Sequence, residues 1–173
     1  SSEKFNMLKP YIQISEAFRR KQDTLHFIKK AEKDTLAVYK YPEGTLVDLN
    51  EADTTELKKI PGIGSGIARM IVAYRKRLGG FYDMAQLKEV NYVDEDMLRW
   101  FKLGNAPIHR INANKAGLDK LRSHPYMNFY QAKVIIEYRR KKGKLKSLSQ
   151  LSLYEEFTEK DLERLSHYLS FFF

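Results

Sequence analysis

An internal repeat is the feature that most restricts the folds open to this chain. Aligned with itself at an offset of 64 residues, the sequence shows identical residues at many positions without a gap. The matched pairs are Asn50 and Asn114, Ala52 and Ala116, Leu57 and Leu121, Pro61 and Pro125, Ala68 and Ala132, Ile71 and Ile135, Tyr74-Arg75 and Tyr138-Arg139, Gly79 and Gly143, Gln86-Leu87 and Gln150-Leu151, and Leu98 and Leu162. The repeat therefore predicts an N-terminal segment, 1–45, followed by two copies of one unit, 46–109 and 110–173.

Helix-capping signals recur within each copy. Asp53-Thr-Thr-Glu56 is a capping box, in which the Asp side chain accepts from backbone N–H groups and the Glu side chain reaches back. It predicts a short helix that turns Leu57 and Ile60 inward. No stretch alternates with a period of two for long enough to predict a sheet, so we expect an all-α fold. Further helices are predicted after the capping residues Asp83, Asp94, Ser147 and Thr158.

A longer helix is predicted directly after the first one in copy one. Pro61-Gly-Ile-Gly64 interrupts the first helix, and Ser65 is placed to cap the next one, at 66–78. Gly79-Gly80 ends that helix in the left-handed conformation that glycine favours. Its apolar residues share one face at helical spacing, namely Ile67, Met70, Ile71 and Tyr74.

Residues 1–45 carry a weaker pattern. Apolar residues between Ile14 and Ala31 keep a helical spacing, and we expect a helix from about Ser15 to Lys33. Tyr41-Pro-Glu-Gly44 is typical of a linker. Because the chain opens at Ser1 without a Met, we expect that an upstream segment was removed, and its nature stays open.

The tight turn at 61–66 is the candidate anion site. We expect its two flanking glycines to supply positive φ or to allow a close approach of the backbone, and the isoleucine between them to point into the core. The amides that open the second helix would then face outward, where the helix dipole favours an anion. A DNA phosphate is a suitable ligand, because contacts of this kind do not depend on the base sequence. The candidate phosphate-binding residues are Gly62, Ile63, Gly64, Ser65, Gly66 and Arg69.

Residues 47–87 resemble the helix-hairpin-helix domain of the ComEA-like competence DNA receptors, and the second copy resembles the divergent repeats of multi-repeat members. The resemblance implies two tandem helix-hairpin-helix (SAM-like) units that bind double-stranded DNA without sequence preference, in uptake or repair and often at the cell envelope. It implies no catalysis, and we expect no cofactor. The landmarks that carry it are Asn50, Ala52, Glu56-Leu57, 61–64, Ala68 and Tyr74-Arg75.

The second copy departs from the first at the hairpin. Pro125-Tyr-Met-Asn128 stands in place of Pro-Gly-Ile-Gly. Asn128 can still adopt a left-handed conformation, but Tyr126 is large where a close approach favours glycine. We therefore expect a weaker phosphate grip here, or a purely structural hairpin. The candidate secondary DNA contacts are Asn128, Lys133 and the basic run Arg139, Arg140, Lys141 and Lys142, and the alternative for the run is a solvated helix end.

Composition and charge favour an anionic partner. The net charge is +9, and in the last third, 110–173, 13 Lys and Arg face 7 Asp and Glu. The absence of Cys excludes disulfides and thiolate metal sites, and the four scattered His predict no metal site. No apolar run approaches the roughly 18 residues of a membrane span.

Two rival functions stay open from the sequence. Some base-excision glycosylases place a catalytic Asp about twenty residues past such a hairpin, and Asp83 follows Gly64 by 19. However, Asp83 is explained as a helix cap, and the chain lacks room for the helices that enclose a flipped base. The other rival is a helical protein-interaction module with a vestigial hairpin, which the neutral charge balance of copy one favours.

Overall fold

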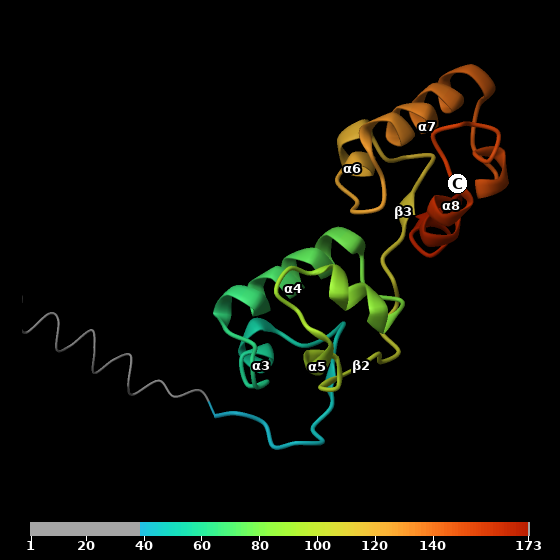
Figure 1. Cartoon of the computed structure of the whole chain (residues 1–173). Coiled ribbons are helices and arrows are strands. Elements are labelled where there is room, and N and C mark those ends of the chain that lie inside the picture. The colour runs from blue at the N-terminus through green and yellow to red at the C-terminus, as the bar shows by residue number, and fades with distance from the viewer. Residues whose placement is uncertain (1–38, 173) are drawn as a thin grey trace, which may run out of the picture. The chain divides into compact units, whose positions relative to one another are not determined.

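The computed structural model describes residues 39–172 (Figure 1). Lys40–Phe173 form one compact unit, distinct from Ser1–Tyr39. The helix expected from Ser15 to Lys33 lies outside the described residues. Among the residues that are described, no helix is long and apolar enough to cross a membrane.

The first repeat begins and ends with a two-residue strand, and helical elements connect the two strands. A short helix and a longer one form the hairpin, and a 3-10 helix and another short helix follow (Figure 1). The elements are β1 (Val47–Asp48), α3 (Thr54–Leu57), α4 (Ser65–Leu78), η2 (Met84–Glu89), α5 (Glu95–Leu98) and β2 (Phe101–Lys102).

The second repeat has the same order of elements. Its hairpin again joins a short helix to a helix of 14 residues. The elements are β3 (Ile111–Asn112), α6 (Leu118–Arg122), α7 (Phe129–Lys142), η3 (Leu148–Gln150), α8 (Glu159–Ser166) and β4 (Leu169–Ser170). The predicted fold class, mostly helical with two tandem hairpins, is confirmed.

The four strands are the part of the fold that the sequence did not predict. β1 pairs with β2 and β3 with β4, both in parallel, with Val47 opposite Phe101 and Ile111 opposite Leu169. Each pair joins the start of a repeat to its end. A strand of two residues is too short to show alternation, which is why the sequence pattern misses it.

Side-chain caps start most of the helices as predicted. Asp53 accepts from the amides of Thr55 and Glu56, and these bonds hold the pKa of its carboxyl below the usual range. The caps predicted at Asp83, Asp94, Ser147 and Thr158 are confirmed as well. The cap predicted at Ser65 is wrong. Ser65 is the first residue of α4, and the N-cap is Gly64, which has no side chain to offer.

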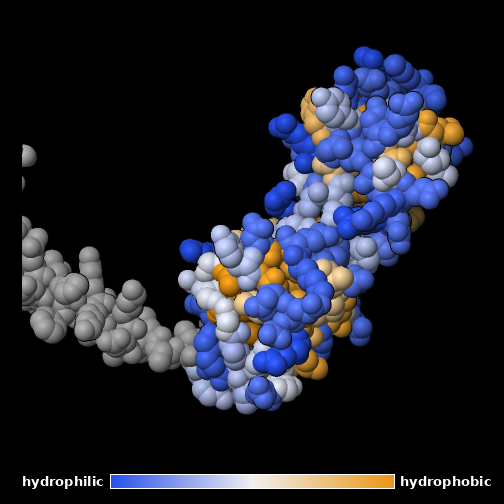
Figure 2. All heavy atoms as spheres, viewed as in Figure 1, coloured by the Kyte–Doolittle hydropathy of each residue, from blue (hydrophilic) through white to orange (hydrophobic). Residues whose placement is uncertain are grey.

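Each repeat has its own apolar core. In the first, Leu57, Ile60 and Ile63 are all at most 1% exposed, as the helical pattern predicts. In the second, Leu121 and Ile135 take the places of Leu57 and Ile71 and are fully buried. Figure 2 shows that the surface on this side of the described unit is mostly hydrophilic. The cores therefore lie inside, beneath the hairpins that they support.

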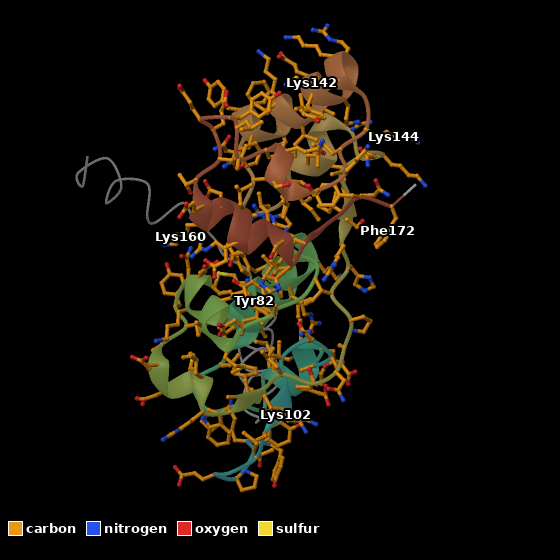
Figure 3. The ribbon with its side chains drawn as sticks, turned by 90° about the vertical axis from the view of Figure 1, so that its right-hand side faces the viewer. Tyr82, Lys102, Lys142, Lys144, Lys160 and Phe172 are labelled. Atoms are coloured by element: carbon orange, nitrogen blue, oxygen red, sulfur yellow. The ribbon has the colours of Figure 1, made fainter. Side chains whose placement is uncertain are left out.

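A buried contact joins the two repeats. Tyr168, just after α8, is fully buried and belongs to the core of the first repeat. Its hydroxyl donates to the carbonyl of Gly80 at 2.9 Å. Nearby, Tyr82 stacks on His167 with ring centroids 3.8 Å apart, at the level where the two repeats meet (Figure 3). These contacts hold both hairpins on one body.

Candidate nucleic-acid interface

The first hairpin is built around a buried isoleucine. Ile63 is 1% exposed, and its amide donates to the carbonyl of Ile60 at 3.2 Å, which closes the turn after α3. Gly62 has a φ of 82°, so the expected left-handed glycine is confirmed there. Gly64 does not have a positive φ, because its φ is −92° and its ψ is 177°, which is extended backbone, and the close approach expected there stays a prediction. Gly64 thus acts as an N-cap rather than as a turn residue.

The amides that open α4 have no acceptor among the described residues. Gly64, Ser65 and Gly66 are exposed, and no side chain caps the helix. Within the described part of the chain, the amides of Ser65, Gly66 and Ile67 donate to nothing outside the helix. A Cβ built at Gly64 or Gly66 would meet no atom within 4 Å. The start of this 14-residue helix is therefore open to an external anion.

Charge around the hairpin favours an anion. The first turn of α4 holds no acidic residue, and Arg69 is exposed one turn further along the helix. The positive end of the helix dipole adds to this charge over the first turn. Arg69 is thus placed on the same helix end as the open amides, as the sequence predicts.

A lysine that the sequence did not single out lies beneath the hairpin. The ammonium of Lys40 donates to three backbone carbonyls, those of Lys58 at 2.6 Å, Ile60 at 3.1 Å and Ile63 at 3.4 Å. The next residue, Tyr41, is fixed by its amide, which donates to the carbonyl of Lys59. The ammonium therefore compensates the partial negative charge of the carbonyl oxygens at the turn.

The sequence pattern does not indicate that Lys40 contacts the hairpin, and its position explains why. It lies before the first copy, next to a segment that the pattern assigns to a linker. The position 64 residues later is Gly104, so the comparison of the two copies gives no signal either. A lysine beside a linker is most often solvated, and nothing in its neighbours indicates that it folds back onto the hairpin.

Two of the repeated landmark residues hold the fold. Arg75 donates to the carbonyls of Leu49 and Ala52, at 2.9 and 2.8 Å. Its counterpart Arg139 donates to the carbonyl of Ala116 at 2.6 Å. Burial lowers the pKa of the Arg75 guanidinium. Arg139 was expected to touch DNA, but its partly buried guanidinium is engaged inside the repeat, and the DNA contact stays a prediction.

The second hairpin differs from the first in how its amides are satisfied. Asn128 has a φ of −87° and a ψ of 174°, so it is extended and does not adopt the left-handed conformation that asparagine allows. Instead, its side chain accepts from the amide of Gln131, and the Gln131 side chain accepts from the amide of Asn128, both at 2.9 Å. Asparagine is as well suited to an N-cap as to a left-handed turn, and the Gln three residues later completes the capping box. The cap therefore occupies one of the first three amides of α7, that of Gln131.

Tyr126 explains why the second hairpin has no glycine at this position. The tyrosine occupies the position of Gly62, and its ring turns toward the first repeat. Its hydroxyl accepts from the Gln86 side chain and donates to the Glu89 carboxylate, both at 2.8 Å. Burial raises the pKa of Tyr126 to about 12, so the hydroxyl keeps its proton. The tyrosine serves the contact between repeats, which supports the structural alternative for this hairpin.

The basic run lies at the end of α7. Lys133 and Lys141 lie 3.9 and 3.7 Å from the carboxylate of Glu137. Lys142 lies over the rings of Tyr138 and Tyr154. Arg140 is exposed. In Figure 3, Lys142 and Lys144 lie at the end of the unit opposite Lys102. The run is exposed but distant from the boundary between the repeats, and its contact with DNA stays a prediction.

The fold and the hairpins define a class of protein, with two tandem helical hairpins, of which the first has a helix start without a side-chain cap. The comparison with protein families agrees with this class. Residues 43–100 and 107–170 each match the helix-hairpin-helix motif. Because these matches cover more than half of the chain, the protein belongs to the helix-hairpin-helix family. We describe it as a DNA-binding helix-hairpin-helix protein.

Curated relatives match the same region. The endonuclease/exonuclease/phosphatase family domain-containing protein 1 of Mus musculus is 27% identical over 154 residues, which cover 70% of this chain and 27% of that protein. The protein of the same name from Xenopus laevis is 25% identical over 146 residues, with 70% and 26% covered. The chain thus spans about a quarter of the length of these relatives. No solved structure gives a significant match.

Proposed function

We propose that this chain binds double-stranded DNA through its phosphate backbone, without sequence preference, and that the first hairpin is the main contact. The observation that carries the proposal is the open start of α4. Among the residues that the structure describes, three amides there lack acceptors, and the glycines leave the backbone accessible. A phosphate oxygen accepts from such amides whatever base it is attached to.

The proposal also assigns unequal roles to the two hairpins. In the second hairpin the Asn128 side chain takes the amide of Gln131, and Tyr126 contributes to the contact between repeats. It therefore offers fewer donors to a phosphate than the first. Exposed cations of the second repeat, such as Arg140, would add contacts along the duplex.

We further propose that the chain contributes binding and no catalysis of its own. The carboxylate of Asp83, the residue that a glycosylase-like mechanism would need, accepts from the amide of Ala85 at 2.8 Å as the cap of η2. Among the described residues, no cluster of His and acidic side chains could hold a metal ion. The process that the chain serves would be DNA uptake of the competence type or DNA repair.

Salt-dependent binding to random duplex DNA tests this function. With about two to four phosphates engaged, the logarithm of affinity should fall against the logarithm of salt with a slope of roughly −2 to −4. Duplexes of unrelated sequence should bind with the same affinity. Binding that is insensitive to salt, or that is strong for one sequence only, would contradict the proposal and favour a protein-interaction module.

A further inference from the structure

An exposed pair of aromatic side chains marks the second hairpin. Phe129 and Tyr130 are 45% and 68% exposed, and their ring centroids lie 5.6 Å apart at an interplanar angle of 80°. Other large apolar side chains on the surface of the described residues, such as Tyr92 and Leu153, stand singly in the sequence. Single exposed aromatic residues are ordinary on a protein surface, but two adjacent ones at the start of a helix form one exposed apolar patch.

The position of the pair connects it with the proposed DNA site. Phe129 and Tyr130 occupy the positions that Ser65 and Gly66 hold in the first repeat, where the open amides are. In Figure 1, the N-terminal ends of α4 and α7 face the same side of the described unit. The buried contacts of Tyr126 and Tyr168 fix the two repeats to each other. A nucleic acid that binds at the first hairpin and runs along this side of the unit would therefore reach the aromatic pair.

The chemistry of the pair differs from that of a phosphate grip. The Asn128–Gln131 box occupies the third amide of α7, that of Gln131, so fewer amides are open to a phosphate there than at the start of α4. Aromatic rings stack on unpaired bases, whose faces a duplex keeps covered. Lys133 is exposed one turn beyond Phe129 and supplies positive charge for the backbone of a strand. The ligand that suits an aromatic pair beside a lysine is a single strand with unstacked bases.

We propose that Phe129 and Tyr130 stack on unpaired bases, so that the chain prefers duplex DNA that continues into a single strand. This inference rests on the proposed function, because the duplex part is held by the first hairpin. The aromatic pair adds a preference for DNA ends with overhangs, which the first hairpin alone does not provide.

The experiment compares two DNA ligands and two variants of the whole chain. The ligands are a blunt duplex of about 20 base pairs and the same duplex with a single-stranded extension of about ten nucleotides that carries 2-aminopurine. The test variant is the double substitution Phe129→Ala and Tyr130→Ala, which places alanine, a good helix former, at both exposed positions. The control is Tyr130→Phe, which keeps both rings.

The wild-type chain and Tyr130→Phe should bind the extended duplex about tenfold more tightly than the blunt one, and quench 2-aminopurine. The double variant should bind both ligands equally, at the wild-type affinity for blunt duplex. If the wild type binds blunt duplex but shows no preference for the extension, or if the double variant keeps the preference, the inference is wrong and the patch serves another partner, such as a protein. If the chain binds neither ligand, the proposed function fails together with the inference.

Discussion

The side-chain amide of Gln86 donates to the hydroxyl of Tyr168 at 2.9 Å, across the boundary between the two repeats. Both side chains are buried, at 4% and 0% exposure. The Gln86 oxygen accepts from the amides of Tyr82 and Asp83, so the same side chain caps η2 in one repeat and binds the other. We therefore expect the two repeats to unfold together rather than as separate units, because separating them would leave buried polar groups of both without partners.

Replacing Tyr168 with Phe tests this boundary between the repeats. The substitution keeps the ring but leaves the carbonyl of Gly80 without its donor in a buried place. The free energy of unfolding should fall by about 1–3 kcal/mol. Urea denaturation measures it, with Tyr92→Phe as the control, because Tyr92 is 79% exposed. Equal stability of the two variants would show that the hydroxyl of Tyr168 adds nothing to the boundary.

A buried histidine should make stability depend on pH. His124 is 2% exposed, and burial lowers its pKa from 6.5 to about 4. One ring nitrogen accepts from the amide of Tyr126, and the other lies 3.0 Å from the carbonyl of Leu78, so the neutral ring is the form that fits. Below about pH 6.5 the unfolded chain takes up a proton that the folded chain refuses, so stability is lost as pH falls toward 4.

The variant His124→Gln removes this titration. Between about pH 7.5 and about pH 5, the wild type should lose about 2 kcal/mol more of its free energy of unfolding than the variant does. Denaturation curves at the two pH values give the comparison, and carboxylates cancel because both chains share them. Parallel losses in the two chains would mean that His124 is protonated in the folded state.

The charge beneath the first hairpin can be removed with Lys40→Met. Without the ammonium, the partial negative charge of the carbonyls of Lys58, Ile60 and Ile63 is no longer compensated beneath the proposed phosphate site. Affinity for random duplex should fall about three- to tenfold, on the order expected for one unscreened charge near a phosphate. Lys160→Met removes the same charge from α8 and serves as the control. If the two variants bind duplex DNA with equal affinity, Lys40 has no part in the phosphate site.

The exposed end of α7 offers a test of the secondary DNA-binding surface. Replacing Arg140, Lys141 and Lys142 with Gln should change the free energy of unfolding little, by about 0.5 kcal/mol or less per residue. If the run touches DNA, affinity drops and the salt slope becomes shallower by up to about one unit for each phosphate that is no longer neutralised. Unchanged affinity and slope would show that the run is a solvated helix end, and that the first hairpin binds alone.

The sequence predicts those parts of the fold that local chemistry determines. The capping boxes at Asp53 and Asp83, the buried Ile63 and the left-handed Gly79 follow from residue type and spacing, and the structure has them. Asn128 shows the limit of such reasoning. Asparagine suits both a left-handed turn and an N-cap, and the partner Gln131 decides between them.

Long-range interactions were beyond the sequence. Aligning the two copies shows only that Tyr126 replaces a glycine. It does not show what the tyrosine contacts, because its partners Gln86 and Glu89 belong to the other repeat. Lys40 lies outside the repeat altogether, and its ammonium reaches carbonyls about twenty residues further along the chain. Neither interaction leaves a periodic pattern, so only the folded chain reveals them.

The most direct measurement of the central claim compares Gly64→Asp with Gly117→Asp. Both glycines are extended N-caps without a side-chain bond, and a Cβ at either would meet no atom within 4 Å. In each variant the new carboxylate caps a helix, so stability should stay equal or rise slightly. At Gly64, however, the carboxylate occupies the amides that are proposed to hold the phosphate.

The quantity to measure is the dissociation constant for random duplex DNA at fixed salt. Gly64→Asp should weaken binding by at least about tenfold, because the new carboxylate takes the hydrogen bonds that would go to the phosphate and also repels it. Gly117→Asp, with the same change in net charge, should bind nearly as well as the wild type. If the two folded variants bind DNA with equal affinity, the open start of α4 is not the phosphate site, and the account of this protein is wrong at its centre.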